Sequence, residues 1–300
     1  MNQRKFLIID SNSVIHRAFH ALPPLTNKEG GLVNAVYGFF SVLIRVANEI
    51  DPSCIITTFD LPGPTFRHKK YCDYKAKRSA TPEDLIDQFF LIKDGLKKMG
   101  VPIIEKEGFE ADDMIGTIAN IISNKEMGDS IILSGDKDVL QLIREDTKVI
   151  LLKKGIKDLL IYDRNLFSEE YRGINPCQLV EVKALQGDMS DNIPGVFGVG
   201  EKTAIDLILK YEDLEGIYKK AVEDESLSSN IRNRLAKGRE DAFLSRDLSR
   251  IRTDVDIDVD FDSCLWRGFE AAITFFENMG FSSLVKRVEN SKVSKNLSLF

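Results

Sequence analysis

Residues 6–10 read FLIID, four apolar residues followed at once by an aspartate. A short run rich in Ile and Leu, bounded by polar residues, is typical of a strand buried on both faces of a parallel sheet. Runs of the same kind recur along the first half of the chain. We predict a strand at each of them: 55–59, 101–104, 130–133 and 149–152.

Helical patterns lie between these strands. The clearest begins at Thr81, with Pro82 at the first helical position and acidic residues in its first turn, and it ends at Gly100. Strands that alternate with helices predict an α/β domain with a mostly parallel central sheet flanked by helices. After about Gly173 the strand pattern stops and only helices are predicted. They span 176–185, 202–210, 229–237 and 270–278.

This change of pattern predicts three regions. Residues 1–173 form the α/β domain, residues 174–290 form a helical region, and residues 291–300 (SKVSKNLSLF) form a loose tail.

The composition indicates a protein of a reducing cytoplasm. With 300 residues, 43% of them hydrophobic, the chain can bury a large core. No apolar run approaches the roughly 18 residues of a membrane span, and the run at 6–9 is too short for a signal peptide. The four cysteines lie far apart without a CxxC pair, which argues against a zinc site and predicts free thiols.

Acidic residues end or follow several of the predicted strands. Asp10 ends FLIID and Asp60 ends IITTFD at 55–60, while others open the helix predicted from Met114 or follow the helix that ends near Leu185. Ligands of open α/β sheets bind at the carboxyl ends of the strands, so we expect these side chains to meet at one edge of the sheet. The set comprises Asp10, Asp60, Glu110, Asp112, Asp113, Asp136, Asp138, Asp188 and Asp191.

Two interpretations of these carboxylates compete. A single one can be a helix cap, because Asp112, Asp113 and Asp138 each lie at a predicted helix start. Caps do not explain an aspartate at the end of several buried strands, and carboxylates packed together repel each other unless cations lie between them. Oxygen ligands without His or Cys favour Mg²⁺, with Mn²⁺ as a substitute. More than one cluster predicts two or more ions, as in two-metal cleavage of phosphodiesters.

The stretch Asp10-Ser11-Asn12 also invites comparison with phosphatases of the haloacid-dehalogenase type. Those enzymes need a second aspartate two residues after the nucleophile, where it acts as an acid. Asn12 occupies that position and cannot do this work, so we set this interpretation aside.

A glycine-rich stretch, 191–203 (DNIPGVFGVGEKT), precedes an apolar helix. A Walker A loop needs Lys directly after the last glycine, but Glu201 intervenes, and neither this loop nor a dinucleotide fingerprint has its preceding strand here. A helix–hairpin–helix over 191–208 fits better, because its glycines let the backbone approach a DNA phosphate at a helix N-terminus. The alternative is a glycine-rich turn between core helices. The predicted DNA contacts are Gly195, Gly198, Gly200, Lys202 and Thr203.

A basic segment, 67–78 (RHKKYCDYKAKR), lies between the second strand and the helix that begins at Thr81. Basic residues interleaved with aromatic rings are typical of single-strand binding, whereas a charge run by itself is usually a solvated face. A neighbouring acidic metal centre favours binding, because a polyanionic substrate needs cations to offset its repulsion. The predicted DNA contacts here are Arg67, Lys69, Lys70, Tyr74 and Lys77.

The net charge of −6 would ordinarily argue against a nucleic-acid partner. If bound cations neutralised the nine carboxylates, that charge would change from −6 to +3. The acidic balance is therefore compatible with a metal site in a DNA-binding protein.

Taken together, these features resemble the flap-endonuclease family, and within it the 5′-nuclease domain at the N-terminus of bacterial DNA polymerase I. The resemblance covers residues 4 to about 288 and rests on the order and spacing of specific blocks. They are LIIDSNSVIHRAFHAL, NAVYGFFSVL, FDLPGPTFRH, DYKAKR, GFEADD, SGDKD and QGDMSDNIPGVFGVGEKTA.

The resemblance implies a PIN-like nuclease core in which all nine carboxylates are metal ligands. It implies that residues 66–81 form a flexible arch, through which a 5′ single strand passes, and that Lys75 and Arg78 are active-site cations. It also implies that the hairpin region is a helix–two-turn–helix that holds a K⁺ ion through backbone carbonyls.

The expected function is that of a structure-specific 5′-nuclease, which cuts DNA at the junction of a 5′ single strand with duplex by divalent-metal-activated water. Removal of flaps or RNA primers in replication and repair would follow, by a monomer at the bacterial nucleoid with no membrane attachment. A non-catalytic DNA-binding module is a rival that the nine carboxylates disfavour. A single-strand ribonuclease is another, and it should lack the hairpin. The chain is either a free-standing nuclease or a fragment of a DNA polymerase I.

Overall fold

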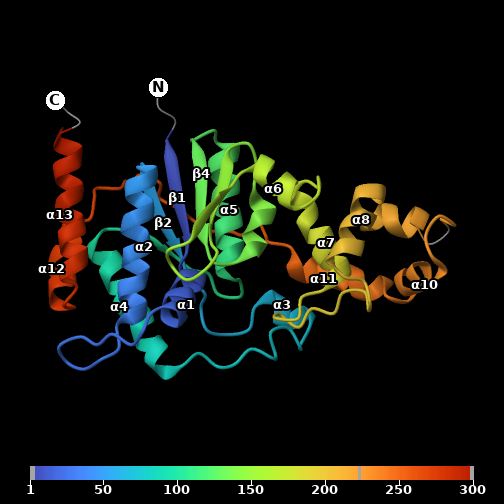
Figure 1. The fold of residues 1–300 in the computed structure, drawn as a ribbon, viewed down its shortest axis with the longest axis horizontal. Coiled ribbons are helices and arrows are strands. Elements are labelled where there is room, and N and C mark those ends of the chain that lie inside the picture. The colour runs from blue at the N-terminus through green and yellow to red at the C-terminus, as the bar shows by residue number, and fades with distance from the viewer. Residues whose placement is uncertain (1–3, 222–223, 298–300) are drawn as a thin grey trace.

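The computed structural model describes residues 4–221 and 224–297 (Figure 1). Its centre is a six-stranded sheet with the strand order β3-β2-β1-β4-β5-β6. Neighbouring strands pair in parallel, except that β6 is antiparallel to β5. The strands are β1 (Lys5–Asp10), β2 (Cys54–Thr58), β3 (Ile103–Ile104), β4 (Asp129–Ser134), β5 (Thr147–Leu152) and β6 (Leu159–Tyr162).

The predicted α/β class with a mostly parallel sheet is confirmed, and all five predicted strands are present. β6 lies outside the prediction. It forms a hairpin with β5, in which the N–H of Lys153 donates to the carbonyl of Asp158 at 2.9 Å. The prediction relied on strands that alternate with helices, and a hairpin breaks that alternation.

Alternate residues of each strand face two helical layers. In β1, Phe6 and Ile8 point into one core, while Leu7 and Ile9 point into the other. Figure 1 shows the sheet between α2 and α4 on one side and α5 on the other. The helices of the first half are α1 (Ser11–Ala21), α2 (Asn34–Ile50), α3 (Phe66–Lys70), α4 (Glu83–Lys98), α5 (Ala111–Asn124), the 3₁₀ helix η1 (Lys137–Leu142) and α6 (Arg164–Glu170).

The best-predicted helix, α4, begins one residue later than the capping pattern indicates, because Pro82 itself takes the N-cap position. Its first turn carries Glu83 and Asp84, which favour the positive end of the helix dipole. Beyond its end, Gly100 has a φ of +68°, a conformation that costs glycine little.

The second half is helical in the part of the chain that the structure describes. Its α-helices are α7 (Leu179–Gln186), α8 (Glu201–Tyr211), α9 (Leu214–Gly216), α10 (Ser229–Lys237), α11 (Arg239–Ser249), α12 (Ile273–Asn278) and α13 (Ser282–Leu297). Short turns of other types complete it: η2 (Pro176–Gln178), η3 (Ile217–Ala221) and η4 (Glu270–Ala272).

The expectation of one helical region over 174–290 does not hold for its last part. α12 and α13 lie beside α2, far from α8 and α10 (Figure 1). The cause is an aromatic contact, since the rings of Phe275 and Phe276 lie 5.6 and 5.3 Å from the ring of Phe40 on α2. These side chains complete the apolar core on that face of the sheet.

Residues 291–297, which were predicted as part of a loose tail, lie in α13, which continues to Leu297. The sequence of α13 contains no Gly or Pro that would end a helix earlier. Residues 298–300 lie outside the described residues. Among the helices described here, none is both long and apolar enough to cross a membrane.

Candidate active site

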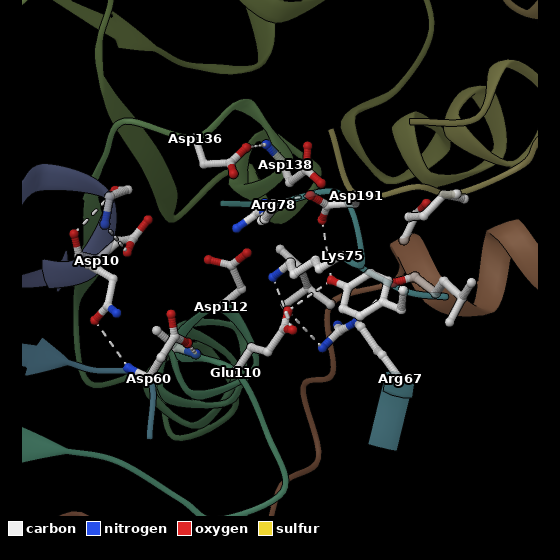
Figure 2. A pocket seen from close by; sticks show the side chains of 18 of the residues that line it. Asp10, Asp60, Arg67, Lys75, Arg78, Glu110, Asp112, Asp136, Asp138 and Asp191 are labelled. Atoms are coloured by element: carbon white, nitrogen blue, oxygen red, sulfur yellow. Dashed lines mark hydrogen bonds and ion pairs between the residues drawn. The ribbon is translucent and has the colours of Figure 1, made fainter. Parts of the chain in front are cut away.

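A cavity of about 490 Å³ opens at the carboxyl edge of the sheet. β1 lies at its base, between β2 and β4. The chain passes from β1 to β2 and β3 on one side and then crosses back to β4 on the other side of β1. Such a switch point is where open α/β sheets bind their ligands. Seven of the nine predicted carboxylates line this cavity (Figure 2): Asp10, Asp60, Glu110, Asp112, Asp136, Asp138 and Asp191.

Several of these carboxylates are placed by local backbone structure. Asp10 is the last residue of β1 and the N-cap of α1, and it accepts hydrogen bonds from the N–H of Ser13 at 3.1 Å and from Oγ of Ser134 at 2.5 Å. Asp136 follows β4 and caps η1 by accepting from the N–H of Asp138 at 2.9 Å. Capping therefore applies to Asp10 and Asp136, while Asp138, which was predicted to cap this helix, does not cap it. Of the other two residues predicted as caps, Asp113 accepts from the N–H of Glu110 at the start of α5.

Burial and mutual repulsion disfavour negative charge in this cavity. Burial raises the pKa of Asp10 to about 6. Burial, with repulsion from Asp136, raises the pKa of Asp138 to about 7. Burial likewise raises the pKa of Asp112, and the charges of Asp10 and Asp136 add to it. These carboxylates are therefore at their most stable when a proton or a cation accompanies them.

Two cations of the basic segment contact carboxylates of other elements (Figure 2). Nζ of Lys75 lies 3.0 Å from Oε1 of Glu110, and Arg78 pairs with Asp191. Tyr74 donates from its hydroxyl to Glu110 at 3.1 Å and to Asp191 at 3.3 Å. These contacts hold the basic segment against the cavity. Lys75 and Arg78, the two predicted active-site cations, both line it.

Asp113 does not line the cavity, in contrast to the expectation that it is a metal ligand. Its side chain is fully buried and forms a two-pronged ion pair with Arg67, at 2.7 and 2.8 Å. Arg67 is 2% exposed and also donates to the carbonyls of Leu248 and Arg250. Arg67 is thus engaged by buried protein groups, although it is among the residues that line the cavity.

Other residues of the basic segment differ in their exposure. Tyr74 is 3% exposed, so its ring is not the stacking surface that the sequence suggests. Lys69 and Lys77 are exposed, and Lys77 lines the cavity. Lys70 is exposed and pairs with Asp247 on α11.

Asp188 lies beside the cavity rather than in its lining, and an unpredicted residue explains its position. Nζ of Lys183 lies 2.9 Å from Oδ2 of Asp188 and also pairs with Asp138. Burial raises the pKa of Asp188, but Lys183 and Ser190 outweigh it and hold the value at about 2. The available signal was a lysine in α7, whose other residues are apolar apart from Glu181 and Gln186.

The cavity fits divalent cations by its chemistry. Within residues 4–221 and 224–297, Asp10, Asp60, Asp112 and Asp136 form no ion pair, although all four line one cavity. No three acidic, His or Cys side chains of that part of the chain already converge as ligands of one ion would. The lack of a protein cation beside these four carboxylates agrees with a repulsion that a bound cation would remove.

The predicted hairpin joins α7 to α8, and its residues divide into buried and exposed ones. Gly195 is buried, and its N–H donates to Oγ of Ser245 at 2.9 Å, so it does not face a phosphate as predicted. Gly198 is exposed with a φ of +78°, and its carbonyl accepts from Arg234 at 2.5 Å. Gly200 is the exposed N-cap of α8.

The start of α8 carries both an acidic and a basic exposed residue, Glu201 and Lys202. No side chain caps its first turn, where Lys202 is exposed and Thr203 is partly exposed. The adjoining Phe197 is 92% exposed, which the sequence did not single out.

Two family models cover most of the chain. The N-terminal resolvase-like domain of 5′-3′ exonucleases matches residues 5–172, and the C-terminal SAM fold of the same family matches residues 174–272. The chain belongs to the 5′-3′ exonuclease family. The resemblance inferred from the sequence blocks is thereby confirmed.

Curated relatives in this family are bacterial DNA polymerases. DNA polymerase I of Bacillus caldotenax is 38% identical over 290 residues, which cover 96% of this chain and 33% of the relative. DNA polymerase I of Bacillus subtilis (strain 168) is 37% identical over 288 residues, with coverages of 95% and 32%. The chain thus spans about a third of the length of these relatives.

Solved structures share the fold at low sequence identity. T5 5′-exonuclease with bound zinc superposes with a TM-score of 0.68 at 20% identity, covering 96% of this chain and 98% of that one. A product complex of the bacteriophage T5 flap endonuclease with DNA and metal ions gives 0.66, also at 20% identity and with the same coverages. The catalytic core of Rad2 with DNA substrate gives 0.60 at 16% identity, with coverages of 96% and 92%.

Proposed function

We propose that this chain is a structure-specific 5′-nuclease, which hydrolyses DNA phosphodiesters where a 5′ single strand meets duplex. The observation that carries this proposal is the set of seven carboxylates at the switch point of the sheet, with Lys75 and Arg78 pointing into the same cavity. Acidic oxygens for cations and basic groups for a phosphate are the two requirements of phosphodiester hydrolysis. Membership of the 5′-3′ exonuclease family supports the reaction.

The site is proposed to hold two or more divalent cations, Mg²⁺ by preference and Mn²⁺ as a substitute, because the ligands available are oxygens. Asp10, Asp60, Asp112 and Asp136 would hold one ion, with Glu110 beside them. Asp138, Asp188 and Asp191 would hold another, while Asp113 stays in its ion pair. When bound, such ions lower the pKa of a water nucleophile and stabilise charge on the leaving oxygen. Structural neighbours with bound metal ions, zinc in one of them, support divalent cations in general.

Lys75 and Arg78 are proposed to act on the scissile phosphate. Both reach the cavity from one short segment, and both now pair with carboxylates that a metal ion would engage. A cation bound by those carboxylates would release the two side chains toward a phosphate. There they would offset negative charge as it builds up in the transition state.

The hairpin between α7 and α8 is proposed to grip the duplex part of the substrate. The uncapped N-terminus of α8, with Gly198, Gly200, Lys202 and Thr203 at the surface, suits a backbone phosphate. A K⁺ ion held by carbonyls of this hairpin is part of the proposal. Lys69, Lys70 and Lys77 would neutralise the single-stranded part.

The biological setting is proposed to be flap or RNA-primer removal during replication and repair, by a monomer in the bacterial cytoplasm at the nucleoid. DNA polymerase I relatives support this setting. We also propose a boundary between an α/β nuclease unit and a helical DNA-binding unit near residue 173, supported by the two family models, which meet there.

Cleavage of end-labelled 5′-flap DNA, with Mg²⁺ or with EDTA, tests the proposal. We expect cuts within a few nucleotides of the junction in Mg²⁺ and none in EDTA. Controls are the matching single strand and the blunt duplex, which should be cut much more slowly. Efficient cleavage of single-stranded RNA without a junction preference would instead identify a ribonuclease.

A further inference from the structure

Lys183 is a buried cation that contacts two of the carboxylates proposed as metal ligands. It lies in the middle of α7, and the residue is 8% exposed. Its Nζ pairs with a carboxylate on each side: Asp188, just beyond the end of α7, at 2.9 Å, and Asp138, on η1. The ammonium therefore links the cavity lining to the carboxylate that lies outside it.

The burial of this lysine is balanced by its two partners. An unpaired ammonium inside a protein is costly, while one between two carboxylates is compensated. The other buried charge of α7, Glu181, is compensated in the same way by Arg246 and Arg250. Lys183 differs because its partners belong to the proposed metal site.

Lys183 contacts one oxygen of each carboxylate, so a divalent ion held by both Asp138 and Asp188 would lie next to its ammonium. Two cations in contact with the same carboxylates repel each other strongly where water is scarce. The ion can therefore bind there fully only when the ammonium moves away.

We propose that Lys183 is a built-in competitor for the second divalent ion. This inference rests on the proposed function. The lysine holds Asp138 and Asp188 together in the metal-free protein, and it makes the second ion bind weakly. Tight occupancy then needs the further oxygen ligands that a substrate phosphate supplies, so the second ion is bound chiefly when DNA is present. Lys183 is a positioning residue, because it acts through the carboxylates.

The test is Mn²⁺ binding to the DNA-free protein, followed by calorimetry and by the electron paramagnetic resonance signal of free Mn²⁺. Lys183→Met keeps the length and apolar stem of the side chain and removes the charge. We expect the weaker of two wild-type sites to tighten by at least about tenfold in this variant. Lys183→Arg should stay close to wild type. Lys210→Met, which breaks the exposed pair with Asp224, is the matched control and should change neither site.

A weaker site that is unchanged or weakened in Lys183→Met would overturn the inference. If that variant unfolds without metal, its thermal midpoint in a Mn²⁺ series decides instead, because removal of a competitor predicts a larger rise than in wild type. Lys183→Gln provides a second variant for the same measurement. A wild-type protein that binds no Mn²⁺ would contradict the proposed function itself, whereas two wild-type sites with no response to Lys183→Met would contradict this inference alone.

Discussion

Individual side chains of the cavity divide into carboxylates that have a protein cation and carboxylates that have none. Glu110 is paired with Lys75, Asp191 with Arg78, and Asp138 with Lys183. We therefore expect paired and unpaired carboxylates to have different roles, although they look alike in the sequence. Single substitutions in the cavity should for the same reason change the cleavage rate and the affinity for DNA to different extents.

Lys75→Ala and Arg78→Ala should each lower the single-turnover cleavage rate by at least about tenfold, because charge on the transition state loses a partner. The substrate dissociation constant should change far less. Lys69→Ala is the matched control, since it removes a charge from the same segment outside the cavity lining, and it should alter affinity more than rate. If both variants lose affinity but keep the wild-type rate at saturating substrate, Lys75 and Arg78 bind DNA and do not act in the cleavage step.

Asp136→Ala should abolish cleavage while sparing DNA binding. Substitution of a residue in the shell behind metal ligands already costs about 10–100-fold, so loss of a ligand should cost at least about 100-fold. Affinity for flap DNA should stay or rise, because one source of phosphate repulsion is gone. Asp163→Asn, at the N-cap of α6 outside the cavity lining, is the control. A normal rate in Mg²⁺ for Asp136→Ala would remove Asp136 from the site.

For single residues, the sequence predicted the carboxylates that line the cavity better than it predicted their partners. Strand ends place Asp10 and Asp136 directly, because adjacent parallel strands end at one edge. The pairing of Arg67 with Asp113 depends on α3 lying against α5, and the position of Lys183 depends on α7 lying against η1. Such contacts between distant segments have no signature in local spacing.

Secondary-structure elements likewise divide into those that local sequence predicts and those that depend on contacts between distant segments. Buried strands and capped helices were predictable because apolar runs and caps are local signals. The hairpin of β5 with β6, the continuation of α13 and the return of α12 to the α2 face were not, because tertiary packing decides them. The loop between α7 and α8 is intermediate: its position was predictable, but the burial of Gly195 beneath α11 was not.

Lys202→Gln should weaken binding to duplex-containing DNA and lower the slope of log affinity against log salt by about one, the change expected for one lost phosphate contact. Lys210→Gln makes the same charge change at the other end of α8 and should leave the slope unchanged. Fluorescence anisotropy on flap DNA over a salt titration measures both. Equal slopes for Lys202→Gln and wild type would show that Lys202 contacts no phosphate and that the loop is a structural turn.

Gly198→Val tests the backbone of the same hairpin. A Cβ at this position would lie 2.6 Å from Nη1 of Arg234, on a residue whose φ is +78°. We expect weaker duplex binding with cleavage of a bound substrate largely retained. Gly63→Val, also at positive φ but with nothing within 4 Å of the added Cβ, controls for backbone strain alone.

The whole molecule concentrates acidic charge at one edge of its sheet, and its stability should depend on pH accordingly. Burial raises the pKa of Asp10 to about 6 and of Asp138 to about 7, above their unfolded values. The folded protein therefore binds more protons than the unfolded chain, and this contribution to stability is lost as pH rises through those values.

Without metal, the thermal midpoint should fall between about pH 4 and about pH 7, that is, from the ordinary carboxylate pKa to the raised folded values. Saturating Mg²⁺ should remove most of that fall, because a cation then takes the place of the proton. Calorimetry across this range measures the fall, and Asp10→Asn should flatten the part that ends near pH 6. A metal-free midpoint that rises over the same interval would have the opposite sign to the one expected.

The central claim is that divalent ions bind among these carboxylates, and anomalous scattering from crystals grown with Mn²⁺ tests it most directly. The account predicts at least one strong peak within ligand distance of Asp10, Asp112 and Asp136, and a second beside Asp138 that strengthens when DNA is present. Peaks confined to other surfaces, in protein that cleaves flap DNA in the same Mn²⁺ buffer, would contradict it.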